Sequence, residues 1–254
     1  PNVTNILPPA KAALDGGADA VSLINTINSI MRVDYDSLTM YPTTDGMGTH
    51  GGYCGEAVKP IALNMVAEIA RTKETRSIPV SGIGGITDWR DAVDFLALGA
   101  TNVQVCTAAM VYGFKIIDDL VDGLSNFLDD KQLTLDGLIG KAVPSVTDWQ
   151  YLNLNYVEKA VIDQELCIQC GRCHVVCEDT SHQAITHTVN GKRHFEVIDA
   201  ECVGCNLCVS VCPVDSCITM RQLTEGTDPR TGEPISDVKA NWTTHPNNPM
   251  RKTD

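Results

Sequence analysis

The sequence predicts an α/β fold, the C-terminal part of a TIM (β/α)8 barrel, followed by a small α+β domain. Two observations support this prediction. Residues 1–130 alternate short apolar segments with segments of helical periodicity, which is typical of parallel strands joined by crossover helices. Residues 161–221 contain two cysteine runs of identical spacing, which together hold eight of the chain's 11 cysteines. The chain therefore divides into a barrel part and a cysteine-rich part.

The elements of the barrel part are predicted from periodicity and from residues that begin or end helices. Pro60 suits the first turn of a helix, Thr87 or Asp88 can cap one, and Gly99 can end one. In order, the elements are a helix within 6–20, a strand at 20–25, a helix at 59–72, a strand at 78–83, a helix at 87–100, a strand at 101–106 and an amphipathic helix at 113–130. The polar, glycine-rich stretch from about 26 to 56 follows the first strand.

The loops after the last two strands favour a barrel over a doubly wound sheet. One strand runs into GIGGI at 82–86, and the next runs into CTAAM at 106–110 before a short helical step. In barrels, the loops after strands seven and eight, with a short extra helix, bind phosphate through backbone N–H groups. We therefore interpret the three strands as strands six, seven and eight, and we expect five further strands upstream of residue 1.

The two cysteine runs have the spacing of bacterial two-[4Fe–4S] ferredoxins. They read CIQCGRCHVVC at 167–177 and CVGCNLCVSVCP at 202–213. In that pattern, three cysteines of one run ligate one cluster and the fourth cysteine ligates the other cluster. We therefore assign one cluster to Cys167, Cys170, Cys173 and Cys212, and the second to Cys202, Cys205, Cys208 and Cys177.

Zinc is the alternative to iron–sulfur clusters. Zinc ribbons need two CxxC pairs, whereas this chain offers two full tetrads, so the spacing favours clusters. Glu178 follows the first tetrad where ferredoxins usually have proline, a departure that concerns backbone geometry more than ligation. Cys217, outside the tetrads, is expected to be a buried thiol, and His174 and His182 are expected to be surface or packing residues.

Composition excludes several classes of partner. The net charge is −13 and no basic stripe occurs, so nucleic acid is not expected to bind. No apolar run reaches membrane-spanning length, and no export signal opens the sequence. Because free cysteines and clusters suit a reducing compartment, we expect a cytoplasmic protein. We predict four segments: a barrel part at 1–130, a connector at 131–160, a ferredoxin-like two-cluster domain at 161–221 and an extended tail at 222–254.

Four motifs in the barrel part resemble a known family. INT at 24–26, GGYCGEAVKPIAL at 51–63, SGIGGI at 81–86 and VQVCTAAM at 103–110 resemble dihydroorotate and dihydropyrimidine dehydrogenases. The ferredoxin-like domain and HQAI at 182–185 narrow the resemblance to the FMN/iron–sulfur subunit of NAD-dependent dihydropyrimidine dehydrogenases. This resemblance implies two [4Fe–4S] clusters, FMN, and a partner subunit that carries FAD and binds NADH. It also implies reversible reduction of uracil or thymine to the 5,6-dihydro forms.

The resemblance also assigns site residues. Asn25 and Thr26 match the pair that hydrogen-bonds the pyrimidine; without the family context, Asn25 would be read as a loop cap. Residues matching FMN contacts are Gly55, Ile83, Gly84, Gly85, Cys106 and Thr107. Cys106 is expected to contribute its backbone, and Cys54 has no evident partner in the sequence.

Two family residues have no counterpart in this sequence. The general-acid cysteine that protonates the pyrimidine, and a lysine that contacts FMN, both correspond to positions before residue 1. We therefore expect the chain to be part of a longer protein, with the N-terminal half of the barrel missing. Two alternatives stay open: a dihydroorotate dehydrogenase or another FMN oxidoreductase with a fused ferredoxin, and a pure electron carrier whose barrel part is a scaffold. Flavin content and turnover of uracil against orotate discriminate between them.

Overall fold

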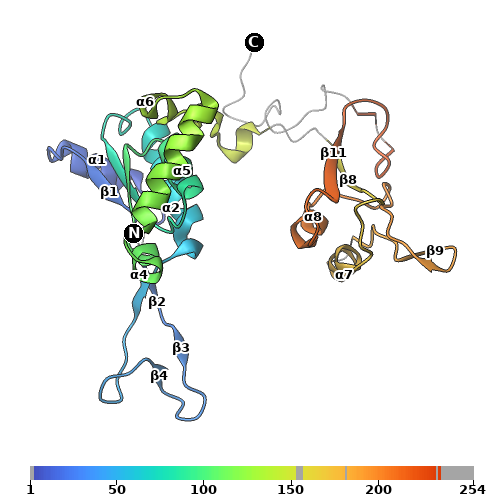
Figure 1. Ribbon diagram of the computed structural model, residues 1–254, viewed down its shortest axis with the longest axis horizontal. Helices are drawn as coiled ribbons and strands as arrows, with labels where there is room; N and C mark the ends of the chain where they lie inside the picture. The colour runs from blue at the N-terminus through green and yellow to red at the C-terminus, as the bar shows by residue number, and fades with distance from the viewer. Residues whose placement is uncertain (1–2, 153–156, 181, 233, 236–254) are drawn as a thin grey trace. The chain divides into compact units, whose positions relative to one another are not determined.

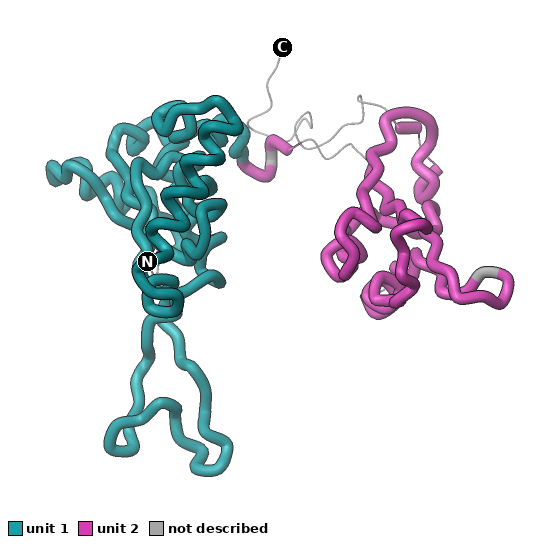
Figure 2. Tube along the Cα trace, viewed as in Figure 1, with its two compact units in different colours: residues 1–147 teal, residues 148–254 magenta. Residues whose placement is uncertain are grey.

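The structure is a computed structural model that describes residues 3–152, 157–180, 182–232 and 234–235 of the 254-residue chain. The chain divides into two compact units, Pro1–Thr147 and Asp148–Asp254 (Figure 2). Each unit has its own hydrophobic core. The elements of each unit are labelled in Figure 1.

A three-stranded parallel sheet with the order β1-β6-β7 forms the centre of the first unit. The strands are β1 (Val21–Leu23), β6 (Val80–Ile83) and β7 (Asn102–Gln104). Spatial neighbours follow one another along the chain and are parallel, with a helix before each new strand. This is the arrangement of successive strands in a (β/α)8 barrel, so the α/β prediction is confirmed.

Most helices of the first unit begin or end where the sequence predicts. They are α1 (Leu7–Asp15), α2 (Lys59–Arg71), α3 (Trp89–Ala97), α4 (Thr107–Tyr112), α5 (Ile116–Lys131) and α6 (Leu135–Leu138). Of the two candidate caps, Asp88 is the N-cap of α3, because its carboxylate accepts hydrogen bonds from the backbone N–H groups of Arg90 and Asp91. The 3-10 turn η1 (Glu56–Val58) leads into α2, and η2 (Val143–Ser145) follows α6.

The core of the first unit lies between the sheet and helices α2 and α3. Ala62, Val66 and Ile69 of α2 are buried at helical spacing, and Phe95 of α3 is fully buried. A β-carbon at Gly82 would lie 2.5 Å from the Phe95 ring, so the absence of a side chain at 82 lets this helix pack closely against β6.

The stretch from about 26 to 56 is not structureless. It forms an arm of two antiparallel pairs, β2 with β5 and β3 with β4, which projects from the sheet and helices of its unit (Figure 1). Its strands are β2 (Ile27–Ser29), β3 (Arg32–Val33), β4 (Met40–Tyr41) and β5 (Gly51–Tyr53). Strands of two or three residues are too short for an alternating pattern to reveal them, so the sequence did not predict the arm.

The second unit is built on one antiparallel pair, β8 (Val157–Ile162) with β11 (Ile218–Leu223). Ile218 pairs with Ile162 at one end of the pair, and Leu223 pairs with Val157 at the other. The remaining elements are η3 (Trp149–Tyr151), α7 (Arg172–Asp179), β9 (Thr188–Val189), β10 (Lys192–Arg193) and α8 (Leu207–Val211). The core of this unit consists of cysteines, small residues, isoleucines and Phe195.

The four predicted segment boundaries stay predictions. β8 begins at Val157, within the segment 131–160 that the sequence assigns to a connector, and α6 also lies in that segment. In the predicted tail, Asp228 is buried, and residues 236–254 lie outside the described part of the chain. Within the described residues, no helix combines the length and apolarity that a bilayer crossing requires.

Candidate functional site

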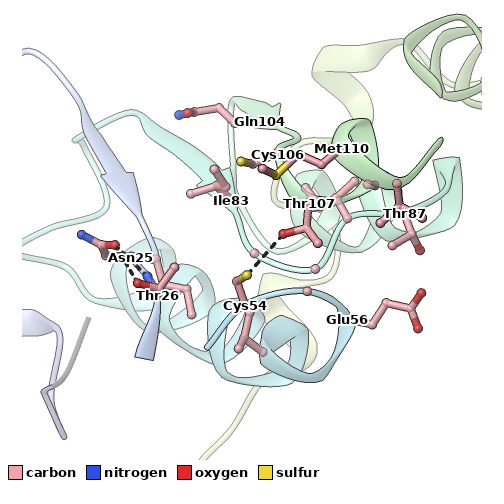
Figure 3. A pocket seen from close by; sticks show the side chains of 18 of the residues that line it. Asn25, Thr26, Cys54, Glu56, Ile83, Thr87, Gln104, Cys106, Thr107 and Met110 are labelled. Carbon is pink, nitrogen blue, oxygen red and sulfur yellow. Dashed lines mark hydrogen bonds between the residues drawn. The ribbon is translucent and has the colours of Figure 1, made fainter. Parts of the chain in front are cut away.

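A cavity of about 390 Å³ opens at the carboxyl ends of the three parallel strands (Figure 3). It is lined by the end of β1, the turn before α2, the loop after β6 and the start of α4. All eight barrel residues predicted to contact substrate or flavin line it: Asn25, Thr26, Gly55, Ile83, Gly84, Gly85, Cys106 and Thr107. Parallel strands present their carboxyl ends at one edge, which is why residues about 80 positions apart meet here.

The loop after β6 is a backbone surface that a phosphate group can approach. Gly85 has φ +78°, and a β-carbon there would lie 2.8 Å from the carbonyl oxygen of Gly55. The two glycine-containing loops therefore touch through their backbones. Within the described residues, the backbone N–H groups of Gly85 and Thr107 donate no turn, loop or cap hydrogen bond to a backbone acceptor. Such uncommitted N–H groups beside a cavity suit an anionic oxygen, so the residues present fit the phosphate of FMN.

Asn25 and Thr26 follow β1 and are both exposed at the cavity. The Asn25 Oδ1 atom accepts hydrogen bonds from the backbone N–H of Thr26 (2.8 Å) and from its hydroxyl (3.3 Å). This is the local capping contact that Asn25 would make without any substrate. The geometry thus supports the loop-cap reading and also leaves the side chain at the mouth of the cavity, where a planar ring can reach it.

Cys54 lacked a partner in the sequence, but the structure supplies one. The Thr107 hydroxyl donates to the Cys54 sulfur at 3.4 Å, and both side chains line the cavity (Figure 3). This contact joins the turn before α2 to the start of α4, which are 53 residues apart. Gln104 is a second lining residue that the sequence did not single out, and its amide donates to the hydroxyls of Ser22 (2.8 Å) and Ser81 (2.7 Å).

A half-buried ion pair lies next to the glycine loop after β6 and helps to hold it in place. The Lys59 ammonium contacts the Asp91 carboxylate and lies 2.8 Å from Asp94 Oδ2. Asp91 also accepts from the backbone N–H and the hydroxyl of Thr87, both at 2.8 Å, and so connects α2 to the end of the loop. Burial raises the pKa of Asp91, but the hydrogen bonds from Lys59 and Thr87 outweigh burial, so the net pKa lies below its usual value.

A Lys59→Met variant tests this support. We expect the free energy of unfolding at neutral pH to fall by about 1–3 kcal/mol, because a half-buried carboxylate loses its charged donor. Since the Asp91 pKa is depressed in the folded state, this contribution is present above the unfolded pKa and is lost as the pH falls through the folded pKa. The difference from the wild type should therefore shrink below about pH 4.

Chemical denaturation of the full-length protein across pH measures that difference. Lys11→Met is the matched control, because Lys11 pairs with Asp15 at 2.9 Å on an exposed helix face, where an ion pair contributes little. Equal losses in the two variants would contradict a supporting role for Lys59.

The cysteine-rich unit contains two small cavities, and each gathers one of the predicted ligand sets. One cavity is lined by Cys167, Cys170, Cys173 and Cys212, and the other by Cys177, Cys202, Cys205 and Cys208. The fourth cysteine of each run thus lies with the other run, in the crossed grouping that the sequence predicts. Within the described residues, no group of His, Cys, Asp or Glu is arranged around a single metal ion, so the ligand assignment rests on spacing and on shared cavities.

The chemistry of these cysteines suits a cationic centre. Burial raises the pKa of the Cys208 thiol to about 11, and it also raises the pKa of Cys173. Iron would stabilise the thiolate forms that burial disfavours, because coordination to a cation replaces the lost hydration. The backbone N–H of Ala184 already donates to the Cys177 sulfur at 3.2 Å, a contact that also favours the anionic sulfur.

Cys217 and His182 lie close to the predicted ligands. Cys217 is buried, lines the cavity of Cys167 and donates to the Asp163 carbonyl oxygen at 3.7 Å. Burial, with Cys212 and Cys167 nearby, raises its pKa to about 12. His182 is half-buried and lines the cavity of Cys177. His174 has its Nδ1 atom 2.6 Å from the Ile185 carbonyl oxygen, which agrees with the packing role expected for it.

Lys159 and Asp228 are charged residues that sequence reasoning missed. Both are buried, and the Lys159 ammonium lies 3.4 Å from the Asp228 carboxylate and donates to the carbonyl oxygen of Cys202 at 2.6 Å. Lysine in a short strand is ordinarily read as a solvent-facing residue, and nothing in the local pattern signals its burial. Burial raises the pKa of Asp228, but the backbone N–H of Arg230 and the Lys159 ammonium outweigh that effect and lower it.

Comparison with known proteins matches both parts of the chain to family models. Residues 1–128 match the dihydroorotate dehydrogenase model, and residues 160–220 match a 4Fe-4S dicluster domain model. The barrel part and the two-cluster part are therefore recognised independently of each other. The first match implies a flavin-dependent TIM barrel, which agrees with the fold class predicted from the sequence.

Curated relatives match different shares of the chain. The chain is 38% identical over 224 residues to the NAD-dependent dihydropyrimidine dehydrogenase subunit PreA of Escherichia coli K12, which is 88% of this chain and 54% of the relative. It is 41% identical over 133 residues, 50% of this chain and 31% of the relative, to the chloroplastic dihydropyrimidine dehydrogenase (NADP+) of Arabidopsis thaliana.

The dihydroorotate dehydrogenase B (NAD+) catalytic subunit of Pyrococcus horikoshii is 39% identical over 145 residues, which is 56% of this chain and 45% of the relative. The chain thus spans about half the length, or less, of the curated relatives it matches. The relatives share the oxidoreductase character that the family match indicates.

Proposed function

Because the chain belongs to the dihydroorotate dehydrogenase family, we propose that it is part of an oxidoreductase that interconverts uracil or thymine and their 5,6-dihydro forms. The electrons are proposed to come from NADH through a partner subunit that carries FAD. One observation carries the proposal: a barrel cavity with a glycine loop and a domain with two cysteine tetrads occur in the same chain. The barrel of the dihydroorotate dehydrogenase type supports a pyrimidine substrate. The iron–sulfur domain in the same chain supports delivery of electrons one at a time.

The proposed cofactors divide the chemistry between them. When bound, FMN would supply hydride transfer to the pyrimidine and exchange single electrons, and [4Fe–4S] clusters would carry single electrons. The residues of this chain are proposed to bind FMN and the clusters and to orient the substrate. The backbone N–H groups of Gly84 and Gly85 and the Thr107 hydroxyl are proposed to hold the FMN phosphate, with Gly55, Ile83 and Cys106 lining its site.

Substrate orientation is assigned to Asn25 and Thr26. An amide carries both a donor and an acceptor, which suits a ring with alternating N–H and C=O groups. Binding such a ring requires the Asn25 carboxamide to exchange its local contact with Thr26 for contacts to the ring. The proposal assigns no residue of this chain to protonation of the pyrimidine.

The proposed location is argued from the cysteines that would hold the clusters. Exposed cysteines such as Cys170 and Cys205 remain available to iron only where thiols stay reduced. We therefore place the protein in the cytoplasm, as part of a hetero-oligomer with the FAD-bearing subunit.

The test uses the full-length protein, purified anaerobically and combined with its partner subunit and NADH. Bound FMN, two clusters per chain and turnover of uracil or thymine support the proposal. Turnover of dihydroorotate or orotate, with none of uracil and thymine, would instead assign the chain to a dihydroorotate dehydrogenase with a fused ferredoxin. Intact clusters without FMN would make the chain an electron carrier.

An Asn25→Ala variant tests substrate orientation. We expect KM for uracil to rise about tenfold or more, because a ring group left without its hydrogen bond costs about 1–3 kcal/mol. FMN content should not change, since Asn25 is not assigned to the flavin. Steady-state kinetics with uracil as the varied substrate measures the effect.

Asn5→Ala is the matched control for this variant. Asn5 makes the same kind of local contact, because its Oδ1 atom accepts from the backbone N–H of Leu7 at 2.9 Å, and it does not line the cavity. If Asn25 served only as a loop cap, both variants would alter stability and neither would alter KM. An unchanged KM in Asn25→Ala would therefore remove Asn25 from the substrate site.

A further inference from the structure

Two buried charges lie beside one of the two cysteine cavities. Lys159 is 1% exposed and Asp228 is 7% exposed, and they are the charged side chains that are buried within the described residues. A lysine ammonium is costly to bury unless donors and charges are matched. Packing alone does not explain a buried lysine, because an apolar side chain would fill the same space without the free-energy cost of burying a charge.

Lys159 contacts the loop that carries two predicted cluster ligands, Cys202 and Cys205. Its ammonium donates to the Cys202 carbonyl oxygen at 2.6 Å. The backbone of the preceding residue, Glu158, packs against the same loop, since a β-carbon at Gly204 would lie 2.6 Å from the Glu158 carbonyl oxygen. Gly204 has φ +73°, so a side chain there would be strained as well as crowded. Strand β8 thus holds the Lys159 charge against the loop that carries Cys202 and Cys205.

Asp228 partly balances that charge from a different segment. Its carboxylate lies 3.4 Å from the Lys159 ammonium and accepts from the backbone N–H of Arg230 (2.9 Å) and the hydroxyl of Thr231 (3.3 Å). The balancing negative charge therefore lies in the chain after β11. Because both charges are shielded from water, their electric fields are screened less and act over longer distances than those of surface charges.

The loop that carries Cys167 and Cys170 is contacted by an exposed cation instead of a buried one. Arg193 donates to the Cys170 carbonyl oxygen at 3.0 Å, and its guanidinium lies 5.5 Å from the centre of the Phe195 ring. Arg193 is exposed, so water and salt screen its charge. The two loops therefore accept equivalent hydrogen bonds, but among the described residues only the loop of Cys202 has a buried cation next to it.

Charge beside an iron–sulfur cluster is one of the factors that set its reduction potential. Gaining an electron makes a cluster more negative, and a nearby cation stabilises that state. We propose that Lys159 is a positioning residue that raises the reduction potential of the cluster held by Cys177, Cys202, Cys205 and Cys208, and that Asp228 opposes it. The inference rests on the cluster binding in the proposed function and not on pyrimidine turnover.

The consequence is an electrostatic difference between the two clusters. The electron added first to the domain should reside on the cluster beside Lys159, because its reduced state is the better stabilised of the two. A purely structural role makes a different prediction. Replacing Lys159 or Asp228 would then loosen the chain after β11, and the cluster reduction potential would not shift in a defined direction.

The test is a dye-mediated redox titration of the anaerobic full-length protein, followed by electron paramagnetic resonance of the reduced clusters. Lys159→Met should shift one cluster to a more negative potential, and Asp228→Asn should shift the same cluster to a more positive one. Lys159→Arg should restore the wild-type value. Arg193→Met, the exposed counterpart, should leave both potentials near their wild-type values.

Shifts of the same sign in Lys159→Met and Asp228→Asn, or no shift, would overturn the proposal. If Lys159→Met fails to take up clusters, Asp228→Asn decides, since an unshifted potential in that variant overturns the assignment and a positive shift supports it. The titration needs neither NADH nor pyrimidine. A wild-type protein with two titrating clusters but no uracil turnover would contradict the proposed function and leave the role of Lys159 intact.

Discussion

A Gly85→Ala variant should lose its flavin. The residue has φ +78°, where a side chain is strained, and the added carbon would lie 2.8 Å from the Gly55 carbonyl oxygen and 2.9 Å from the Lys59 β-carbon. The loop can relieve these contacts only by moving away from the turn before α2, which opens the proposed phosphate site. We expect FMN affinity to fall about 100-fold, or about 2.7 kcal/mol, measured by flavin fluorescence after dialysis.

Gly17→Ala is the matched control for this loss. Gly17 has φ +83°, so it carries the same backbone strain, but a β-carbon there meets no atom within 4 Å. This variant should be slightly less stable and should keep its FMN. If Gly85→Ala retained FMN, the loop after β6 would not be the phosphate site. If both variants lost FMN, backbone strain alone would account for the result.

A Cys177→Ser variant should remove one cluster and so abolish the proposed NADH-driven turnover. Cys177 belongs to the run 167–177, yet it lines the cavity of Cys202, Cys205 and Cys208. The cluster lost should therefore be the one that a Cys205→Ser variant also loses. Turnover should fall more than about 100-fold, because even residues behind metal ligands contribute 10–100-fold to affinity or activity. Iron content and paramagnetic resonance spectra identify the missing cluster.

Cys217→Ser is the control for this loss. Cys217 is buried and lines the cavity of Cys167, but it lies outside both tetrads. We expect this variant to keep both clusters and most of its turnover. If Cys177→Ser instead removed the cluster that a Cys170→Ser variant loses, the ligand sets would not cross between the runs. Loss of a cluster in Cys217→Ser would contradict the assignment of the fourth ligand in the set that includes Cys212.

Local sequence was sufficient for the elements whose signals lie close together in the chain. Helix α3 begins at Trp89, directly after Asp88, one of the two predicted caps, and the three parallel strands lie within the predicted apolar segments. The arm between β1 and α2 was missed, because its strands have only two or three residues and depend on pairing with one another. Short strands gain their stability from the partner strand, which no local pattern encodes.

By itself, the sequence determined the chemistry that spacing encodes. Each cysteine run and the glycine loop are local patterns, because the residues that define each of them lie in one short stretch of the chain. Only the tertiary structure decided what surrounds them. Lys159 lies 43 residues from Cys202 and 69 from Asp228, and Thr107 lies 53 from Cys54. Contacts over such separations depend on how strands and loops pack, so the buried charge beside one cluster became visible only in the folded chain.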